Sequence, residues 1–540
     1  MYSHADRVAS YWIGEMNRDA GMTIALWAVA ALALLIAWVR WPGRQTRSSS
    51  VPPTWALALL VALGIVARLA ALPAENLWYD EAFTYVTAGQ PLPVMLDALL
   101  GDVHPPLWYI ISAPFAGGTD WLVRVPACAF SVATLLLFAW WLRRLRLGAP
   151  AELLALGMMA LAPAQVRYGA EARMYAALEF AGLLMLVGLT LHRPRVLAAG
   201  VALAPWLQHV GGWLSAGCAV GIWVLDDPRV VRTIVTRLQG SLPGKDSGVG
   251  WLAGALAAAA PGLGMFGYQA STVATTGWYW LNHHTPGTYL HDAIWGQWFS
   301  GSNTFESLGW VAAVVGLGLG ALAFASALWS LRARPTVGSG YHWAQVCALW
   351  AFGPGLALYM VSQWQPLLLP RVLLFTAPAL YVLAARQLAR WPRWPLRAVT
   401  IVMLALAAGG IAQHLSGQVR GADLDFFQQT RAAGCSSVVH SEPSSWLLAQ
   451  VYAPDENHVL WDAFPLGLMA GAMSERTIAA LGGELGGLDA GACLVYEDHA
   501  AVPAANIAEL QRHVAGIEPA LVLRDDRSIE VSVYRMEGEP

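Results

Sequence analysis

The sequence predicts an all-α polytopic membrane protein of about 12 spans with a small extracytoplasmic α/β domain at its C-terminus. Of the 540 residues, 57% are hydrophobic and only 12% are charged, whereas a soluble protein carries about 25% charged residues. Apolar runs of about 20 residues, the length that crosses a bilayer as a helix, recur along the chain. Lysine and arginine gather in alternate loops between these runs.

The apolar runs set the number of spans. Runs long enough for one span each lie at 21–39, 54–72, 122–142, 250–268, 306–331, 342–361, 367–385 and 398–415. Shorter or fused runs lie at 152–164, 174–190 and 196–225. The run 196–225 is too long for one straight span and has Arg195 and Arg229 at its ends. We therefore predict a hairpin that turns around Gln208–Gly212.

Charge placement predicts which loops are cytoplasmic. One set of loops contains 18 Lys or Arg residues, and its members are 40–53, 143–151, 192–195, 226–249, 332–341 and 386–397. The alternate loops contain only Arg167, Arg173 and Arg371. Because positively charged loops stay inside, we predict an inner-membrane protein whose loop 73–121 is extracytoplasmic. The net charge of −3 and the single lysine exclude a basic stripe for nucleic acid.

The composition changes after residue 415, which predicts a division into 1–53, 54–415 and 416–540. The last segment has 18 acidic residues, a predicted helix at 502–514, and strand-like runs at Ser437–His440, His458–Trp461, Ala492–Tyr496, Ala520–Leu523 and Ile529–Arg535. Cys435 and Cys493 both fall in this segment, and in an oxidising compartment we expect them to form a disulfide. The other cysteines fall in spans, where we expect buried, inert thiols: Cys128, Cys218 and Cys347.

Two acidic groups mark the first outer loop. Asp80 and Glu81 directly follow an aromatic pair after a span, where adjacent carboxylates could act as a general base and its neighbour. They could equally be acids at a helix start, where negative charge is favourable. Asp102 and His104 precede two prolines that suit the first turn of a helix. For His104 alone, a simple cap and turn is the plainer interpretation.

Two arginines on the extracytoplasmic side indicate an anionic ligand. The turn after the 152–164 run contains Tyr168, Glu171, Arg173 and Tyr175, and Arg371 lies in a later outer loop. Guanidinium groups bind phosphate well. The alternative interpretation is that Glu171 and Arg173 pair with each other.

These motifs, in this order, resemble the GT-C-type glycosyltransferases, in the branch of the protein O-mannosyltransferases and the aminoarabinose transferase of lipid A. The resemblance covers roughly 54–385 and rests on the strings WYDEA, DVHPPLWY, WLVRVP and YGAEARMYA. Gln208–His209 and Pro370–Leu374, followed by Pro378, are also similar to the family. The chain departs from it at Val372, where the family often has Tyr, and in the additional run 21–39.

The resemblance implies an inverting transfer from a polyprenyl-phosphate-linked sugar to a lipid, glycan or protein acceptor. It implies that Asp80 is the catalytic base, that Glu81 and His104 shape the catalytic pocket, and that Arg173 and Arg371 hold the lipid phosphate. The other expected substrate-binding residues are Asp102, Tyr168, Glu171, Tyr175 and His209. Some relatives bind a divalent metal, and the sequence does not decide this for the present chain.

Three other functions fit parts of the sequence. A ligase that uses a pyrophosphate-linked donor would need a similar membrane fold. A flippase or transporter would also carry intramembrane charges, but transporters usually show internal repeats and broken helices at the midplane. An inactive relative could act as an assembly factor, although the intact Asp80–Glu81 pair favours an enzyme.

Overall fold

The structure, a computed structural model, describes residues 52–226, 248–273, 285–290, 294, 296–299, 309–332, 342–365, 367–415, 435, 437–441, 443–461, 474–486, 492–498, 521–524 and 530–535. The chain forms two compact units. The helical unit comprises Met1–Glu75, Arg124–Leu263 and His283–Val419, and the mixed unit comprises Asn76–Val123, Gly264–Asn282 and Arg420–Pro540. Packing therefore groups most of the first outer loop with the C-terminal residues, whereas the division along the chain at 53 and 415 stays a prediction.

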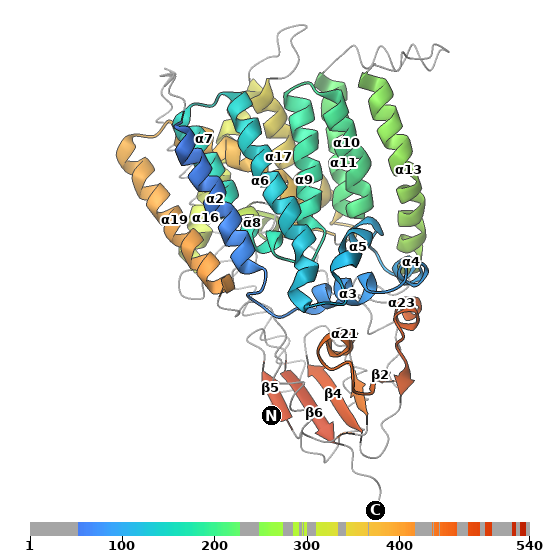
Figure 1. Cartoon of the computed structure of the whole chain (residues 1–540). Helices are drawn as coiled ribbons and strands as arrows, with labels where there is room; N and C mark the ends of the chain where they lie inside the picture. The colour runs from blue at the N-terminus through green and yellow to red at the C-terminus, as the bar shows by residue number, and fades with distance from the viewer. Residues whose placement is uncertain are drawn as a thin grey trace, which may run out of the picture. The chain divides into compact units, whose positions relative to one another are not determined.

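The helical unit is built from membrane-spanning helices (Figure 1). Within the described residues, six helices are long and apolar enough to cross a membrane. They are α2 (Thr54–Ala71), α6 with the turn before it (Asp120–Leu145), α13 (Gly248–Val273), α16 (Gly309–Arg332), α17 (Trp343–Val361) and α19 (Arg393–Leu415). The chain is thus a multi-pass membrane protein. The count of about 12 spans stays a prediction, and the run 21–39 lies outside the described residues.

Prolines interrupt two of the predicted spans. Helices α7 (Ala149–Leu161) and α8 (Pro163–Gly169) meet at a bend of 46°. The predicted run 367–385 begins as a 3-10 helix, η4 (Pro370–Thr376), and continues as α18 (Ala377–Leu388). A proline has no N–H to donate along a helix, so Pro163 and Pro378 each disrupt a continuous α-helical ladder. The run 367–385 is therefore not a single α-helix, contrary to the sequence prediction.

The predicted hairpin is present within the run 196–225. A single residue, Gln208, separates helix α10 (Pro194–Leu207) from helix α11 (His209–Asp226), and the two helices pack along each other. Gln208 between them has an extended backbone (φ −156°, ψ 128°). The chain therefore reverses at Gln208, within the predicted turn.

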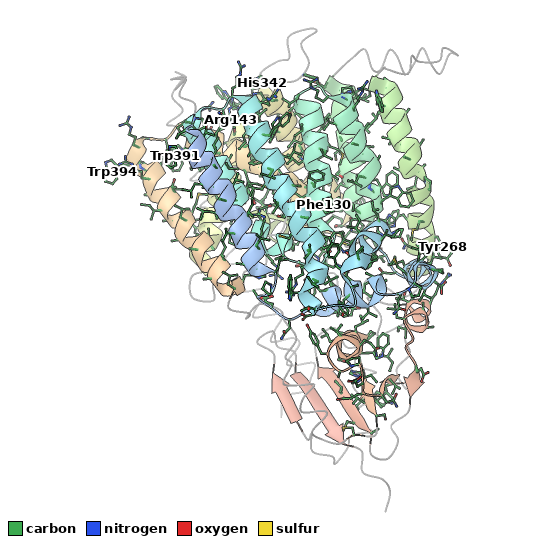
Figure 2. The ribbon with its side chains drawn as sticks, in the orientation of Figure 1. Phe130, Arg143, Tyr268, His342, Trp391 and Trp394 are labelled. Carbon is green, nitrogen blue, oxygen red and sulfur yellow. A yellow bond between two sulfur atoms is a disulfide. The ribbon has the colours of Figure 1, made fainter. Side chains whose placement is uncertain are left out.

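Helix ends that border different predicted cytoplasmic loops lie together at one end of the helical unit. Figure 2 shows four labelled side chains there, Arg143, His342, Trp391 and Trp394. The guanidinium of Arg386 lies 5.3 Å from the centre of the Trp343 ring and donates a 2.8 Å hydrogen bond to Ser330. These three residues come from α18, α17 and α16, so the end of α16, the start of α17 and the end of α18 lie close together.

The mixed unit contains a six-stranded sheet in the order β3-β2-β1-β4-β6-β5. The strands are β1 (Val438–His440), β2 (His458–Trp461), β3 (Leu485–Gly486), β4 (Cys493–Asp498), β5 (Leu521–Arg524) and β6 (Glu530–Arg535). The first four are parallel, and β6 runs antiparallel to both β4 and β5. All five predicted strand runs overlap described strands, the short strand β3 was not predicted, and the predicted helix 502–514 lies outside the described residues.

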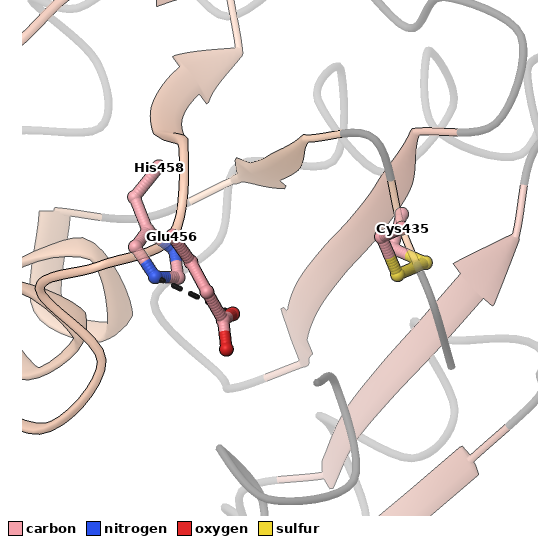
Figure 3. Close-up of a disulfide and its surroundings, with 4 residues drawn as sticks. Cys435, Glu456 and His458 are labelled. Atoms are coloured by element: carbon pink, nitrogen blue, oxygen red, sulfur yellow. Dashed lines mark ion pairs between the residues drawn. A yellow bond between two sulfur atoms is a disulfide. The ribbon is translucent and has the colours of Figure 1, made fainter. Parts of the chain in front are cut away.

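The disulfide prediction is confirmed. Cys435 and Cys493 are bonded, with their Cα atoms 5.6 Å apart (Figure 3). The bond ties the segment before β1 to the start of β4, the parallel neighbour in which Cys493 lies opposite Val438. The other cysteines are free: Cys128 and Cys347 are buried as predicted, whereas Cys218 is only half-buried.

The first outer loop folds as short helices that pack on C-terminal helices of the same unit. The loop helices are α3 (Tyr79–Ala88), α4 (Leu92–Leu100) and α5 (Leu107–Ser112), and the C-terminal ones are α21 (Pro443–Tyr452) and α23 (Glu475–Ala480). Helix α21 packs on α3, and α23 packs on α4. The rings of Phe83 and Tyr109 meet edge to face at 5.7 Å and join α3 to α5. The helices of this loop are therefore a packed part of the mixed unit.

Candidate active site

The two acids at the start of α3 have different environments. Glu81 is 1% exposed, and its carboxylate accepts a 3.5 Å hydrogen bond from the backbone N–H of Trp78. This contact is half of a capping box, which stabilises the first turn of a helix. Asp80 is half-buried in the same turn, and one of its carboxylate oxygens is buried. Glu81 is thus engaged in starting the helix that presents Asp80.

Asp102 and His104 form a close pair after α4. The Asp102 carboxylate lies 2.8 Å from Nδ1 of His104, and the two residues are 3% and 16% exposed. A neutral imidazole held in this way carries its proton on Nδ1 and presents Nε2 as an acceptor. The amide of Gln269 donates hydrogen bonds to the carbonyls of Leu99 and His104 and so fixes the backbone on both sides of the pair. The carboxylate of Asp102 therefore orients the imidazole of His104, and Gln269 fixes the backbone that carries both residues.

Aromatic rings and arginines from three elements, α8, α9 (Tyr175–Thr190) and η4, meet in the helical unit. The rings of Tyr168 and Tyr175 meet edge to face at 5.9 Å, and both residues are buried. The guanidinium of Arg371, on η4, lies 5.4 Å from the centre of the Tyr175 ring. Arg167 lies 5.9 Å from the ring of Tyr168. The structure thus brings together Tyr168, Tyr175 and Arg371, three predicted substrate-binding residues, and places two cations at an aromatic pair.

Glu171 has an arginine partner, Arg167, other than the Arg173 that the sequence suggested. Its carboxylate lies 3.5 Å from Nε of Arg167, four residues earlier, and both side chains are buried. The four-residue spacing could have indicated this pair. Arg173 is buried as well, and its backbone N–H donates to the carbonyl of Glu171. The segment 167–173 therefore carries two buried cations and one buried carboxylate.

Three elements that pack on one another carry Tyr175, His209 and Arg371. Helix α9 (Tyr175–Thr190), helix α11 and η4 are in mutual contact. At Gly182 of α9, a Cβ would lie 2.5 Å from Cβ of Phe375, so the glycine allows η4 to approach the helix. His209 is buried at the first residue of α11.

Several buried polar residues lie inside apolar runs, where the outer-loop motifs do not indicate them. Arg68 is fully buried in α2, and its guanidinium donates to the carbonyls of Met159 and Ala160 at 3.0 and 2.9 Å. In α9, Glu179 is buried and accepts a 2.9 Å hydrogen bond from Gln165. A single ionisable residue inside an apolar run is itself a signal of function or of a buried polar network.

Arg68 stabilises the bend that leads into the candidate segment. The Met159 carbonyl would accept from residue 163 in a continuous helix, but Pro163 has no N–H. Arg68 supplies hydrogen bonds to this carbonyl and to that of Ala160 next to it. It therefore fixes the direction in which α8, the helix that carries Tyr168, leaves α7.

The described residues contain no group of three or more His, Cys, Asp or Glu side chains arranged to hold a metal ion.

Comparisons with known proteins show the fold. No family model matches the sequence, and no curated protein matches it. The crystal structure of ArnT from Cupriavidus metallidurans in the apo state matches with a TM-score of 0.54 and 12% identity, over 89% of this chain and 98% of that one. The structure of the same protein bound to undecaprenyl phosphate matches with a TM-score of 0.51 and 14% identity, over 88% and 97%. ArnT is a GT-C glycosyltransferase, so the chain has the GT-C fold.

Proposed function

We propose that this protein transfers a sugar from a polyprenyl-phosphate-linked donor to an acceptor hydroxyl on the extracytoplasmic face of the inner membrane, with inversion at the anomeric carbon. The observation that carries the proposal is the GT-C fold, shared with ArnT over 89% of this chain. One ArnT structure contains undecaprenyl phosphate, a polyprenyl lipid of the proposed donor class. A bundle of apolar helices suits a donor whose lipid tail stays in the bilayer.

The residues of the helical unit would bind the donor phosphate. As the bond from the anomeric carbon to the phosphate oxygen breaks, negative charge grows on the leaving phosphate. Arg173 and Arg371 would stabilise that charge, because guanidinium–phosphate hydrogen bonds are strong and a preorganised cation needs little reorganisation. The ring of Tyr175 already orients Arg371 by a cation–π contact. Tyr168, Glu171 and His209 would complete the donor site.

The acidic residues of the outer loop would act on the acceptor. Asp80 would take the proton of the acceptor hydroxyl while the oxygen attacks the anomeric carbon from the face opposite the phosphate. Glu81 supports this role by capping the helix that presents Asp80. His104, oriented by Asp102, would hold a sugar or acceptor hydroxyl. A lipid, glycan or protein hydroxyl meets these chemical requirements.

The transfer reaction tests the proposal directly. Purified protein in lipid nanodiscs is given a panel of labelled polyprenyl-phosphate sugars with cell-envelope lipids, glycans and proteins as acceptors, and products are identified by mass spectrometry. The same reactions with and without a chelator test for a divalent metal. We expect Asp80→Asn to lower turnover by ~10²-fold or more, with donor binding retained.

An exposed acid of the mixed unit provides the matched control. Asp455 is exposed between α21 and β2, and Asp455→Asn should transfer sugar at the wild-type rate. If the wild-type protein transfers no sugar from any donor, the proposed function is contradicted. If Asp80→Asn transfers sugar at the wild-type rate, the role of Asp80 is contradicted.

A further inference from the structure

The outer loop that carries the proposed base is fixed by side chains from the C-terminal residues. We propose that Tyr452, the last residue of α21, is a positioning residue for the transfer reaction. Its single hydroxyl binds the chain at both ends of the outer-loop segment 77–120, which contains Asp80, Glu81, Asp102 and His104. The inference rests on the proposed function and adds a role for residues after 415.

The hydroxyl of Tyr452 makes two hydrogen bonds at once. It accepts a 2.6 Å bond from the backbone N–H of Leu77 and donates a 2.9 Å bond to the carboxylate of Asp120. A phenol can accept and donate together, so both bonds are compatible. Leu77 is fully buried, and a buried N–H without a partner is costly. The bond to Tyr452 therefore determines where the backbone lies immediately before α3.

The position of Leu77 sets the start of α3. Leu77 precedes Trp78, whose N–H is bonded to the carboxylate of Glu81, and the helix begins at Tyr79. Asp80 is the second residue of that helix. A short, connected path of backbone thus runs from the Tyr452 hydroxyl to the proposed base. The side chain at the start of this path is rigid, because a tyrosine has only two side-chain torsion angles.

Helix α21 is itself fixed to the sheet. It connects the parallel strands β1 and β2 and packs on both. Trp446 and Leu447 of α21 are fully buried. The disulfide between Cys435 and Cys493 joins the start of the β1 segment to β4 (Figure 3). Tyr452 therefore extends from a helix with little freedom to move, which is what a positioning residue requires.

A second contact fixes the segment that carries Asp102 and His104. The hydroxyl of Thr477, on α23, donates a 2.8 Å hydrogen bond to the carbonyl of Ala98 near the end of α4. At Gly101, a Cβ would lie 2.6 Å from the Thr477 hydroxyl, so only glycine allows this approach. Asp102 follows Gly101 directly and holds His104. The C-terminal residues thus hold both parts of the outer loop, and Tyr452 bonds to Leu77, three residues before Asp80.

The Tyr452 hydroxyl should affect proton removal and not donor binding. Donor binding is assigned to arginines outside this loop, whereas proton removal needs Asp80 in place. Loss of the Tyr452 hydroxyl should therefore lower kcat and leave the donor KM unchanged. Small displacements of a catalytic group cost up to about 100-fold, and we expect about 10-fold for Tyr452→Phe.

The experiment compares Tyr452→Phe with Ser445→Ala in the transfer assay. Ser445 lies on the same helix, and its hydroxyl lies 2.9 Å from Nδ1 of His440, beside the sheet. Both variants lose one hydroxyl, so Ser445→Ala controls for general loss of stability. The expected result is a lower kcat, an unchanged donor KM and an unchanged pH optimum for Tyr452→Phe, with normal kinetics for Ser445→Ala. A wild-type kcat for Tyr452→Phe overturns the inference, as does an equal loss in both variants.

A second variant covers the case in which Tyr452→Phe is not recovered as folded protein. Asp120→Asn keeps the Leu77 bond and weakens the other one, and it should lower kcat in the same direction by a smaller factor. A wild-type kcat for Asp120→Asn in that case overturns the inference. Failure of the proposed function would look different: wild-type protein would then transfer no sugar from any donor in the panel.

Discussion

Arg371 and Tyr175, far apart in the chain, meet with the guanidinium 5.4 Å from the ring centre. The contact joins η4 to the first residue of α9 and orients a cation beside the buried Tyr168–Tyr175 pair. A planar guanidinium can lie along an aromatic face and still present N–H groups to an anion at its edge. This arrangement is the basis for the first prediction.

Arg371→Lys should weaken donor binding although the positive charge is kept. An ammonium group cannot form two parallel hydrogen bonds to a phosphate, and one lost charge-assisted bond corresponds to about a 10-fold increase in the donor KM. Steady-state kinetics with a polyprenyl-phosphate sugar measure this change. Arg144→Lys is the matched control, because Arg144 also stacks on a ring, that of Trp140 at 4.9 Å, but is exposed. Equal donor KM values for Arg371→Lys and wild type would remove the phosphate role.

Asp102 and His104 should act as one unit. Their 2.8 Å contact means that Asp102→Asn replaces the carboxylate that orients the imidazole by a neutral amide, and His104→Gln removes the imidazole itself. Each single variant should lower kcat, and the double variant should be little worse than His104→Gln, because contacting residues are not additive. Transfer kinetics of the four proteins form a complete cycle. Additive losses would show that the two residues work separately.

Arg68 should be needed for stability of the helical unit. Arg68→Met keeps an apolar stem but leaves the carbonyls of Met159 and Ala160 without these bonds, at about 1–3 kcal/mol for each buried group. We expect a clearly lower Tm in a thermal scan of detergent-solubilised protein. Arg143→Met is the control, since Arg143 is exposed and lies 3.6 Å from Glu152 at a helix end. A Tm as high as that of Arg143→Met would contradict the bend-stabilising role.

The mixed unit should lose stability in mild acid because of a histidine pair. Nε2 of His440 lies 2.9 Å from Nδ1 of His458, and Nε2 of His458 lies 3.0 Å from the carbonyl of Ala453. Burial lowers the pKa of His440 well below 6.5, with a further contribution from His458. Burial also lowers the pKa of His458, although Glu456 beside it opposes the shift (Figure 3).

The direction of the pH effect follows from these lowered pKa values. Both folded histidines stay neutral where the unfolded ones begin to bind protons, near pH 6.5. The unfolded state therefore binds more protons as the pH falls below that value, and stability decreases with it. The Tm should be lower at pH 5.5 than at pH 7.5, and His458→Gln should reduce this difference. An equal difference in the variant would contradict the assignment.

The charge pattern predicts the side of each loop. Reporter fusions after Arg146 and Arg334 should be cytoplasmic, and a fusion at residue 420 should be extracytoplasmic, because Lys and Arg accumulate in cytoplasmic loops. Enzyme reporters that are active on only one side of the membrane measure this. A cytoplasmic signal at 420 would contradict both the placement of the C-terminal residues and the proposed face of the reaction.

Much of the fold was predictable because it depends on short stretches of sequence. Spans such as 54–72 and strands such as 458–461 are defined by the apolar character of neighbouring residues. The disulfide was predictable because the charge pattern predicts an oxidising compartment for only two of the cysteines, Cys435 and Cys493. The break within 367–385 was less evident, since the apolar run continues through Pro378 and only the backbone geometry changes.

The candidate site was predictable in its residues but less so in its contacts. Motif order led to Tyr168, Tyr175 and Arg371, which the structure brings together. The Asp102–His104 pair could be expected from their proximity in sequence. That Glu81 rather than Asp80 contacts the backbone N–H of Trp78 could not be expected, because the two acids are adjacent and have the same charge, and only the residue at which the helix starts decides between them.

The sequence by itself determined the membrane-spanning character of this protein, the alternation of its charged loops, its C-terminal strands and the residue types available for phosphate binding and proton transfer. Each of these depends on composition or on spacing within a few turns. Tertiary structure alone decided that Arg68 bonds to the carbonyls near Pro163 and that Tyr452 bonds to Leu77 and Asp120. These bonds join residues far apart in the chain, and many polar side chains could have satisfied the same buried groups. Only the packing of the whole chain selects the side chain that reaches each one.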